Sequence, residues 1–185
     1  IATLRREISV AAGAPMILIS NVDSAFARRS DVAVLSQEGP ANPDHVFHTK
    51  RLPLVGRDVV AYVEAYKRYF AKHTKGGLTI IDPAPRVILD HLLGLCVVGR
   101  TAADAQVVSE IYGHTIDIIQ RATALERWQA LPARDIFAVE YGDIAQAKLA
   151  KAGHPPELTG EIALVTSATS GVGRACIDSL LRRGA

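Results

Sequence analysis

Residues 158–175 read LTGEIALVTSATSGVGRA, and three local signals follow one another in this stretch. Ile162–Val165 is a short apolar run, which is typical of a strand buried on both faces. Ser170, Gly171 and Gly173 predict a tight turn, and apolar residues at helical spacing follow them. The order strand, glycine loop and helix predicts the start of an α/β unit whose helix N-terminus can hold a phosphate.

The glycine loop predicts a binding site for a dinucleotide. Free backbone N–H groups and the positive end of the helix dipole would face the pyrophosphate, while glycine lets the backbone approach it closely. The candidate cofactor-binding residues, acting chiefly through their backbone N–H groups, are Ser167, Ser170, Gly171, Val172 and Gly173. We expect the cofactor to be NAD or NADP. The alternative is a strand–turn–helix in which glycine serves geometry alone.

The same stretch resembles the opening of the short-chain dehydrogenase/reductase family, whose glycine motif is T-G-x-x-x-G-x-G. Thr166, Gly171 and Gly173 match the motif, and Ser167 stands where its first glycine is expected. If that position needs a positive φ, serine costs on the order of 1 kcal/mol there. The family's catalytic Ser and Tyr-x-x-x-Lys lie far downstream of the loop, and no tyrosine here has a lysine four residues later. The resemblance therefore implies part of a cofactor site without catalytic residues.

Upstream of the loop, strand and helix signals alternate, which favours an α/β architecture. Helices are expected over residues 1–12, 21–29, 57–72, 101–122 and 140–151, and strands over residues 16–20, 32–35, 87–89 and 92–98. Two prolines and a glycine between residues 152 and 157 predict a domain boundary. The expected fold class is α/β with a Rossmann-like three-layer arrangement, in which the C-terminal Rossmann unit is cut short after its first strand and helix.

Three segments of the first 150 residues carry a second resemblance. They are residues 39–54 (GPANPDHVFHTKRLPL), residues 82–89 (DPAPRVIL) and residues 135–149, which begin DIFAVEY. In this order, ahead of a dehydrogenase opening, they resemble the bifunctional rhamnulose-1-phosphate aldolase/lactaldehyde dehydrogenase family. That family implies a zinc-dependent class II aldolase half that cleaves a ketose 1-phosphate, followed by an NAD-dependent half that oxidises lactaldehyde, in rhamnose catabolism.

The second resemblance implies a division of the chain into three parts. Residues 1–150 would be an α/β connecting region like the tail of the aldolase half, residues 151–157 a linker, and residues 158–185 the first β–α unit of the dehydrogenase domain. We therefore expect a piece of a longer enzyme that is inactive by itself, with the zinc ligands upstream. The alternative function is a non-catalytic α/β scaffold or oligomerisation module with an inert glycine loop.

Polar residues between the strand and helix signals suggest other sites. His45 and His48, beside Asp44, have a spacing that could bind a metal ion on one helical turn, or they could anchor a loop. The candidates for a basic loop that faces a sugar phosphate, or forms a solvated basic edge, are His48, Lys50, Arg51 and Arg57. A lyase domain that uses His45, His48 and Lys50 is a third reading of function.

Two further pairs of polar residues are candidates for acid–base chemistry. Asp90 and His91 could form an acid/base pair or a polar loop. Asp135 and Glu140 indicate the start of a helix rather than a pair of catalytic carboxylates. The sequence therefore predicts no catalytic residue and no metal ligand in this chain.

Composition limits the partners of the chain. The 185 residues are 49% hydrophobic and 22% charged, with a net charge of +2. The sequence has no long basic run of the kind that would indicate nucleic-acid binding. The longest apolar runs are far shorter than the roughly 18 residues of a membrane span. Cys96 and Cys176 lie in apolar surroundings and predict buried, reduced thiols in a cytoplasmic protein. We expect a homo-oligomer whose partners are a dinucleotide and a small aldehyde or sugar phosphate.

Overall fold

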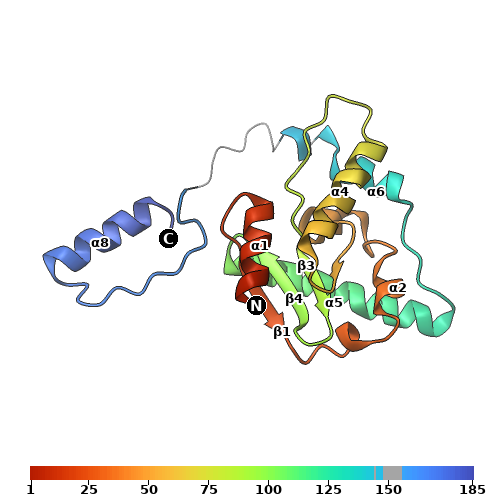
Figure 1. Ribbon diagram of the computed structural model, residues 1–185, viewed down its shortest axis with the longest axis horizontal. Helices are drawn as coiled ribbons and strands as arrows, with labels where there is room; N and C mark the ends of the chain where they lie inside the picture. The colour runs from red at the N-terminus through yellow and green to blue at the C-terminus, as the bar shows by residue number, and fades with distance from the viewer. Residues whose placement is uncertain (144, 148–155) are drawn as a thin grey trace.

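The computed structural model describes residues 1–143, 145–147 and 156–185 (Figure 1). From the N-terminus to the last strand, its elements are α1 (Ala2–Ala12), β1 (Ile17–Asn21), η1 (Phe26–Arg28), α2 (Val32–Ser36), η2 (Pro43–His45), α3 (Val46–Thr49), β2 (Leu54–Val55), α4 (Val59–His73), β3 (Val87–Asp90) and β4 (Gly94–Gly99). They are followed by α5 (Ala102–Leu125), α6 (Ala133–Glu140) and α8 (Gly171–Arg182). This mixture of helices and strands confirms the α/β class.

The four strands form one open sheet in the order β1-β4-β3-β2. Strand β4 pairs antiparallel with both β1 and β3, while β2 pairs parallel with β3. Every residue of β3 and β4 is buried, as expected for the two central strands of a covered sheet. The sheet is therefore the centre of the core.

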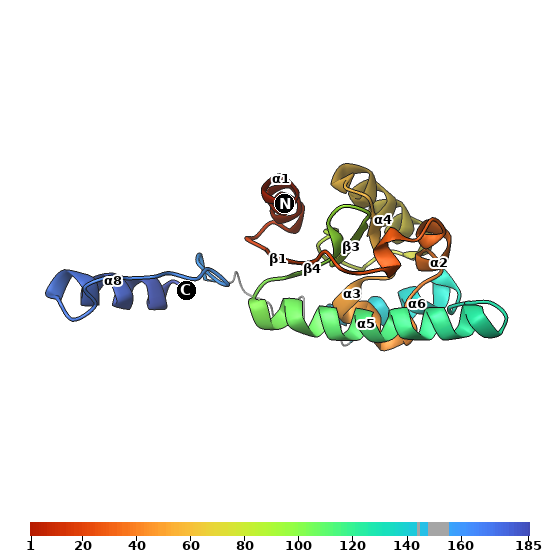
Figure 2. The same cartoon turned by 90° about the horizontal axis from the view of Figure 1, so that it is seen from below.

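Helices cover both faces of this sheet (Figure 2). Val87, Leu89 and Val97 pack with α5, whereas Ile88 and Cys96 pack with residues of α1 and α4. Neighbouring residues of a strand point to opposite faces, so one strand serves two cores. The expected three-layer arrangement is confirmed. None of the described helices has the length and apolar character needed to cross a membrane.

Most of the expected helices are present with the predicted end signals. Helix α1 ends at Gly13 in the left-handed conformation, and α5 begins with a complete capping box between Thr101 and Asp104. Helix α4 covers the predicted amphipathic segment, and its N-cap Asp58 accepts a hydrogen bond from the N–H of Ala61. The strands predicted at residues 16–20, 87–89 and 92–98 are confirmed as β1, β3 and β4.

Two local predictions are wrong, and a third is confirmed only in part. Residues 32–35 form helix α2 rather than a strand, with Val32 and Ser36 buried one turn apart and Val34 exposed. The helix expected over residues 21–29 is the single 3-10 turn η1. The helix expected over residues 140–151 is confirmed in part, because residues 143 and 145–147 are helical although α6 ends at Glu140. Residues 144 and 148–151 of that expected helix lie outside the described residues.

The C-terminal segment contains the predicted helix without the predicted strand. No residue of Ile162–Val165 belongs to a strand, and Ile162 and Leu164 are 87% and 94% exposed. A strand needs a neighbouring strand to pair its backbone groups, and none of the described residues provides one here. Cys96 is buried as expected, but Cys176 is exposed, because it lies on the open surface of α8. Residues 151–155 of the predicted linker lie outside the described residues.

Candidate functional site

The glycine loop is a compact turn at the N-terminus of α8. The N–H of Ser170 donates to the carbonyl oxygen of Ser167 at 2.9 Å, and the hydroxyl of Ser170 accepts from the N–H of Gly173 at 3.0 Å. The five predicted cofactor-binding residues therefore lie together in one turn. Their binding role remains a prediction.

Two positions in this loop have special backbone requirements. Ser167 has φ +55°, so the position that is glycine in the dehydrogenase motif does adopt the left-handed conformation here. A Cβ atom at Gly173 would collide with the carbonyl oxygen of Ser167, because the first turn of α8 packs directly on the loop. By contrast, a Cβ atom at Gly171 would meet no atom within 4 Å. Gly171 thus leaves an open approach to the backbone at the start of the helix.

The predicted histidine site does not have the geometry of a metal centre. In the part of the chain that the structure describes, no group of three or more His, Cys, Asp or Glu side chains is placed to hold a metal ion. Nδ1 of His45 lies 3.4 Å from the hydroxyl oxygen of Thr115 in α5, which ties the turn η2 to that helix. Burial lowers the pKa of His45, and nearby His114 and His48 lower it further. These contacts favour the loop-anchoring interpretation.

Two of the open alternatives, the phosphate-facing basic loop and the acid/base pair, are not formed. Lys50 is buried, and Arg57 makes a two-pronged ion pair with Asp90, with N···O distances of 2.7 and 2.8 Å. Asp90 also accepts the backbone N–H groups of Leu92 and Leu93, which closes the turn between β3 and β4. The Arg57 hydrogen bonds hold the pKa of Asp90 well below its usual range. The side chain of Asp90 thus stabilises the turn, which favours the polar-loop alternative over an acid/base pair.

A buried polar network occupies the space between α3, α4 and α6. The ammonium of Lys50 donates to the carbonyl oxygen of Asp82 at 2.7 Å and lies 3.4 Å from the hydroxyl of Tyr66. The Tyr66 hydroxyl donates to Oε1 of Glu140 at 2.7 Å, and the hydroxyl of Tyr141 lies 2.7 Å from it. Because Tyr66 has a single hydroxyl proton, Tyr141 must be the donor of the last bond.

Burial shifts the proton equilibria in this network. Lys50 is 6% exposed, and its burial lowers the pKa to about 8. Glu140 is 1% exposed, and burial raises its pKa although Lys50 opposes the shift. Oε2 of Glu140 is buried and has no hydrogen-bond partner among the described residues. A buried carboxyl with one oxygen unpaired is costly, which marks this network as more than a packing feature.

The backbone at Lys50 is strained as well. Its φ of 62° and ψ of 170° fall in a region that residues other than glycine rarely adopt. The turn directs Lys50 into the core, while the next residue, Arg51, lies with its guanidinium over the ring of Tyr69, 5.0 Å from the ring centre. Strain of this kind persists where the surrounding structure holds it, and it concentrates at functional sites.

The sequence pattern missed this network. Tyr62, Tyr66 and Tyr69 recur at helical spacing on α4 and resemble core residues, and Glu140 resembled a helix signal. Tyr66 does lie in the core. The useful signal was that several residues on the core face of α4 are tyrosines, because a buried tyrosine hydroxyl needs a hydrogen-bond partner. The partners of the Tyr66 hydroxyl lie 74 and 75 residues away, beyond any local pattern.

The chain can now be compared with known proteins. Residues 1–149 match a protein family described as aldolase class II, second domain. The chain belongs to this family. The match contains the whole buried network, and it ends before the glycine loop of residues 166–173.

One relative extends the comparison. An uncharacterized oxidoreductase of Bacillus subtilis (strain 168), YuxG, is 30% identical over 176 residues, which cover 86% of this chain and 26% of the relative. The chain thus spans about a quarter of the length of the curated relative that it matches. No solved structure matches the chain significantly. The family and the relative connect the chain with class II aldolases and with an oxidoreductase.

Proposed function

We propose that the chain is part of an NAD(P)-dependent oxidoreductase of the short-chain dehydrogenase type, joined to a class II aldolase half. In this proposal residues 166–173 hold the pyrophosphate of the cofactor. The observation that carries it is the open space beside the backbone of Gly171. Directly after it, Gly173 lets the first turn of the helix pack against the loop. This arrangement gives phosphate oxygens access to N–H groups at the start of a 12-residue helix.

The residues of the loop fit this cofactor. Ser167 adopts the left-handed conformation that the motif's glycine would adopt, so the loop keeps its turn without that glycine. The hydroxyl of Ser170 accepts a hydrogen bond from the N–H of Gly173 and so caps the helix. This bond fixes the end of the loop against the first turn of the helix. When bound, the nicotinamide would accept or supply a hydride. The residues of this chain would bind and orient its pyrophosphate.

The reaction of the whole enzyme follows from the family resemblance rather than from this site. We propose cleavage of a ketose 1-phosphate in the aldolase half and oxidation of lactaldehyde in the dehydrogenase half. The class II aldolase family of residues 1–149 supports the first part, and the oxidoreductase name of the Bacillus subtilis relative supports the second. The zinc of such an aldolase and the dehydrogenase's Ser and Tyr-x-x-x-Lys would belong to other parts of the protein.

Calorimetric titration of the complete protein with NADH and with NADPH tests the proposal. Gly171→Val is the informative variant, because its side chain would enter the phosphate approach at a position where an added Cβ meets no atom within 4 Å. Gly113→Val is the matched control, since Gly113 is a helical glycine of α5 that also faces open space. We expect one dinucleotide to bind, Gly171→Val to lose that binding, and Gly113→Val to retain it.

The competing function is a scaffold or oligomerisation module with an inert loop. It predicts that neither dinucleotide binds the complete protein and that Gly171→Val changes nothing. Binding that survives Gly171→Val would also contradict the proposal, because the pyrophosphate would then lie elsewhere.

A further inference from the structure

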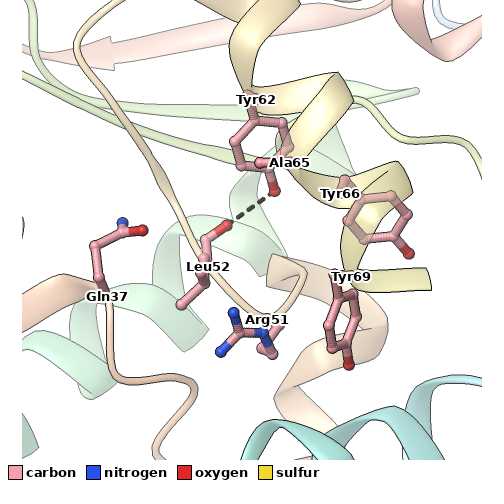
Figure 3. A pocket seen from close by; sticks show the side chains of 7 residues that line it. All are labelled: Gln37, Arg51, Leu52, Tyr62, Ala65, Tyr66 and Tyr69. Carbon is pink, nitrogen blue, oxygen red and sulfur yellow. Dashed lines mark hydrogen bonds between the residues drawn. The ribbon is translucent and has the colours of Figure 1, made fainter. Parts of the chain in front are cut away.

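A small pocket lies between α4 and the segment that follows α3. It has a volume of about 110 Å³, and Figure 3 shows Gln37 on one side, the tyrosines of α4 on the other, and Arg51 and Leu52 between them. The pocket lies in residues 37–69, far along the chain from the glycine loop. It therefore shares no residue with the proposed dinucleotide site.

Most polar groups in the pocket wall already have partners. The hydroxyl of Tyr62 donates to the carbonyl oxygen of Leu52 at 2.9 Å, the dashed bond in Figure 3, and the side-chain amide of Gln37 donates to the carbonyl oxygen of Pro53 at 3.0 Å. Among the described residues, Arg51 forms neither a side-chain hydrogen bond nor an ion pair. Its guanidinium is held only by its stacking on Tyr69. Arg51 is thus a charged donor that remains free to bind a ligand.

The charges around the pocket favour an anion. Behind the tyrosines, the ion pair of Arg86 with Asp82 and the buried Lys50 and Glu140 balance in charge. Arg51 adds one positive charge to this balanced group, and protonation of the buried Glu140 would add another. While Lys50 is protonated, an anion in the pocket would therefore be attracted at close range by a group whose net charge is +1 or more.

We propose that the pocket binds a small organic carboxylate, whose two oxygens accept hydrogen bonds from Arg51 and whose carbon body packs on the tyrosine rings. The planar guanidinium matches the planar carboxylate, so both oxygens can be bound at once. Apart from Gln37, the rest of the lining is aromatic or aliphatic, which suits a carbon body better than the four oxygens of a phosphate. The stacking of Arg51 on Tyr69 holds the guanidinium ready for this pairing.

Titration of the complete protein with benzoate, followed by NMR or calorimetry, tests the proposal. Benzyl alcohol is the neutral analogue of similar shape, and inorganic phosphate is the second anion. We expect benzoate to bind at least tenfold more tightly than either compound. Benzyl alcohol lacks the carboxylate, and phosphate lacks the flat carbon body. Equal binding of benzyl alcohol, binding of phosphate in preference to benzoate, or no binding of benzoate would overturn the proposal.

Two variants and a control locate the site. Arg51→Met should weaken benzoate binding at least tenfold, while Arg68→Met removes the same charge from an exposed position of α4 and should leave binding unchanged. Ala65→Leu fills the pocket and keeps every charge, so it should also abolish binding. If Arg51→Met fails to fold, Ala65→Leu alone decides. Benzoate binding that persists in Ala65→Leu places the ligand elsewhere and refutes the pocket.

Discussion

The hydroxyl of Tyr66 donates a 2.7 Å hydrogen bond to Oε1 of Glu140, which joins α4 to α6 across 74 residues of sequence. The same hydroxyl accepts from Tyr141 and lies 3.4 Å from the ammonium of Lys50. One tyrosine oxygen is thus the centre of a buried network with both a cation and a carboxyl. The packing of α4 against α6 depends on this oxygen as well as on apolar contact.

Tyr66→Phe should lower the free energy of unfolding by about 2 kcal/mol, because Glu140 and Tyr141 each lose a buried partner. The control is Tyr112→Phe, since the buried hydroxyl of Tyr112 in α5 has no hydrogen-bond partner among the described residues. Its loss should be clearly smaller. Urea unfolding of the three proteins measures both. Equal losses in the two variants would show that the network adds nothing beyond packing.

Lys50 should make stability rise with pH above pH 8. Its folded pKa of about 8 lies below the ordinary value of 10.5, so between these values the unfolded chain binds the extra proton and the folded chain does not. Stability then increases with pH by up to about 1 kcal/mol per pH unit. The measurement is the unfolding free energy of the natural protein minus that of Lys50→Met, from pH 7 to pH 9.

Lys67→Met is the control for this pH dependence. Lys67 lies half exposed on α4 and pairs with Glu64, so its removal changes the same charge away from the buried network. Its difference from the natural protein should stay flat over the same range. A flat difference for Lys50→Met too would mean that the ammonium is not desolvated in solution.

The sequence predicted elements whose signals are local. The apolar face of α4, the glycine that ends α1 and the capping box of α5 are each decided by residues within about four positions. The strand prediction for residues 32–35 was wrong because four apolar residues fit a strand or a helical turn equally well. Only packing decides between a strand and a helix here, and Val32 packs in the core between the sheet and α5.

The candidate sites were less predictable for a related reason. The turn of the glycine loop could be anticipated, since Ser170, Gly171 and Gly173 set its geometry locally. The buried network and the pocket at Arg51 could not, because their partners come from α3, α4 and α6. No spacing in the sequence brings Tyr66 to Glu140. The fold does so by packing the two helices together.

Asp90→Asn should lower the free energy of unfolding by about 2 kcal/mol at neutral pH, because a buried carboxylate loses its charged bonds to Arg57. The folded pKa of Asp90 is depressed, so its contribution is present above the ordinary value of 3.8 and is lost as the pH falls below it. The gap between the natural protein and Asp90→Asn should therefore narrow in unfolding measurements from pH 5 to pH 2.

Asp31→Asn is the matched control for Asp90→Asn. Asp31 makes the same two-pronged pair with Arg29, at 2.7 Å for each bond, but both side chains are more than 40% exposed. Water screens such a pair, so its loss should be hard to detect. Comparable losses at the two sites would contradict the assignment of burial as the cause.

Gly173→Ala should open the glycine loop, whereas Gly171→Ala should leave it intact. The new methyl at position 173 would collide with the carbonyl oxygen of Ser167, and that backbone oxygen can move only if the turn from Ser167 to Ser170 opens. The methyl at position 171 enters open space, and alanine favours the helix over glycine by up to about 1 kcal/mol. Hydrogen exchange of the α8 amides, read by mass spectrometry, separates the two. We expect faster exchange than in the natural protein for Gly173→Ala and equal or slower exchange for Gly171→Ala. Faster exchange in both would show that the loop tolerates no side chain at either position, and Gly171→Val could then no longer distinguish a blocked phosphate from a broken turn.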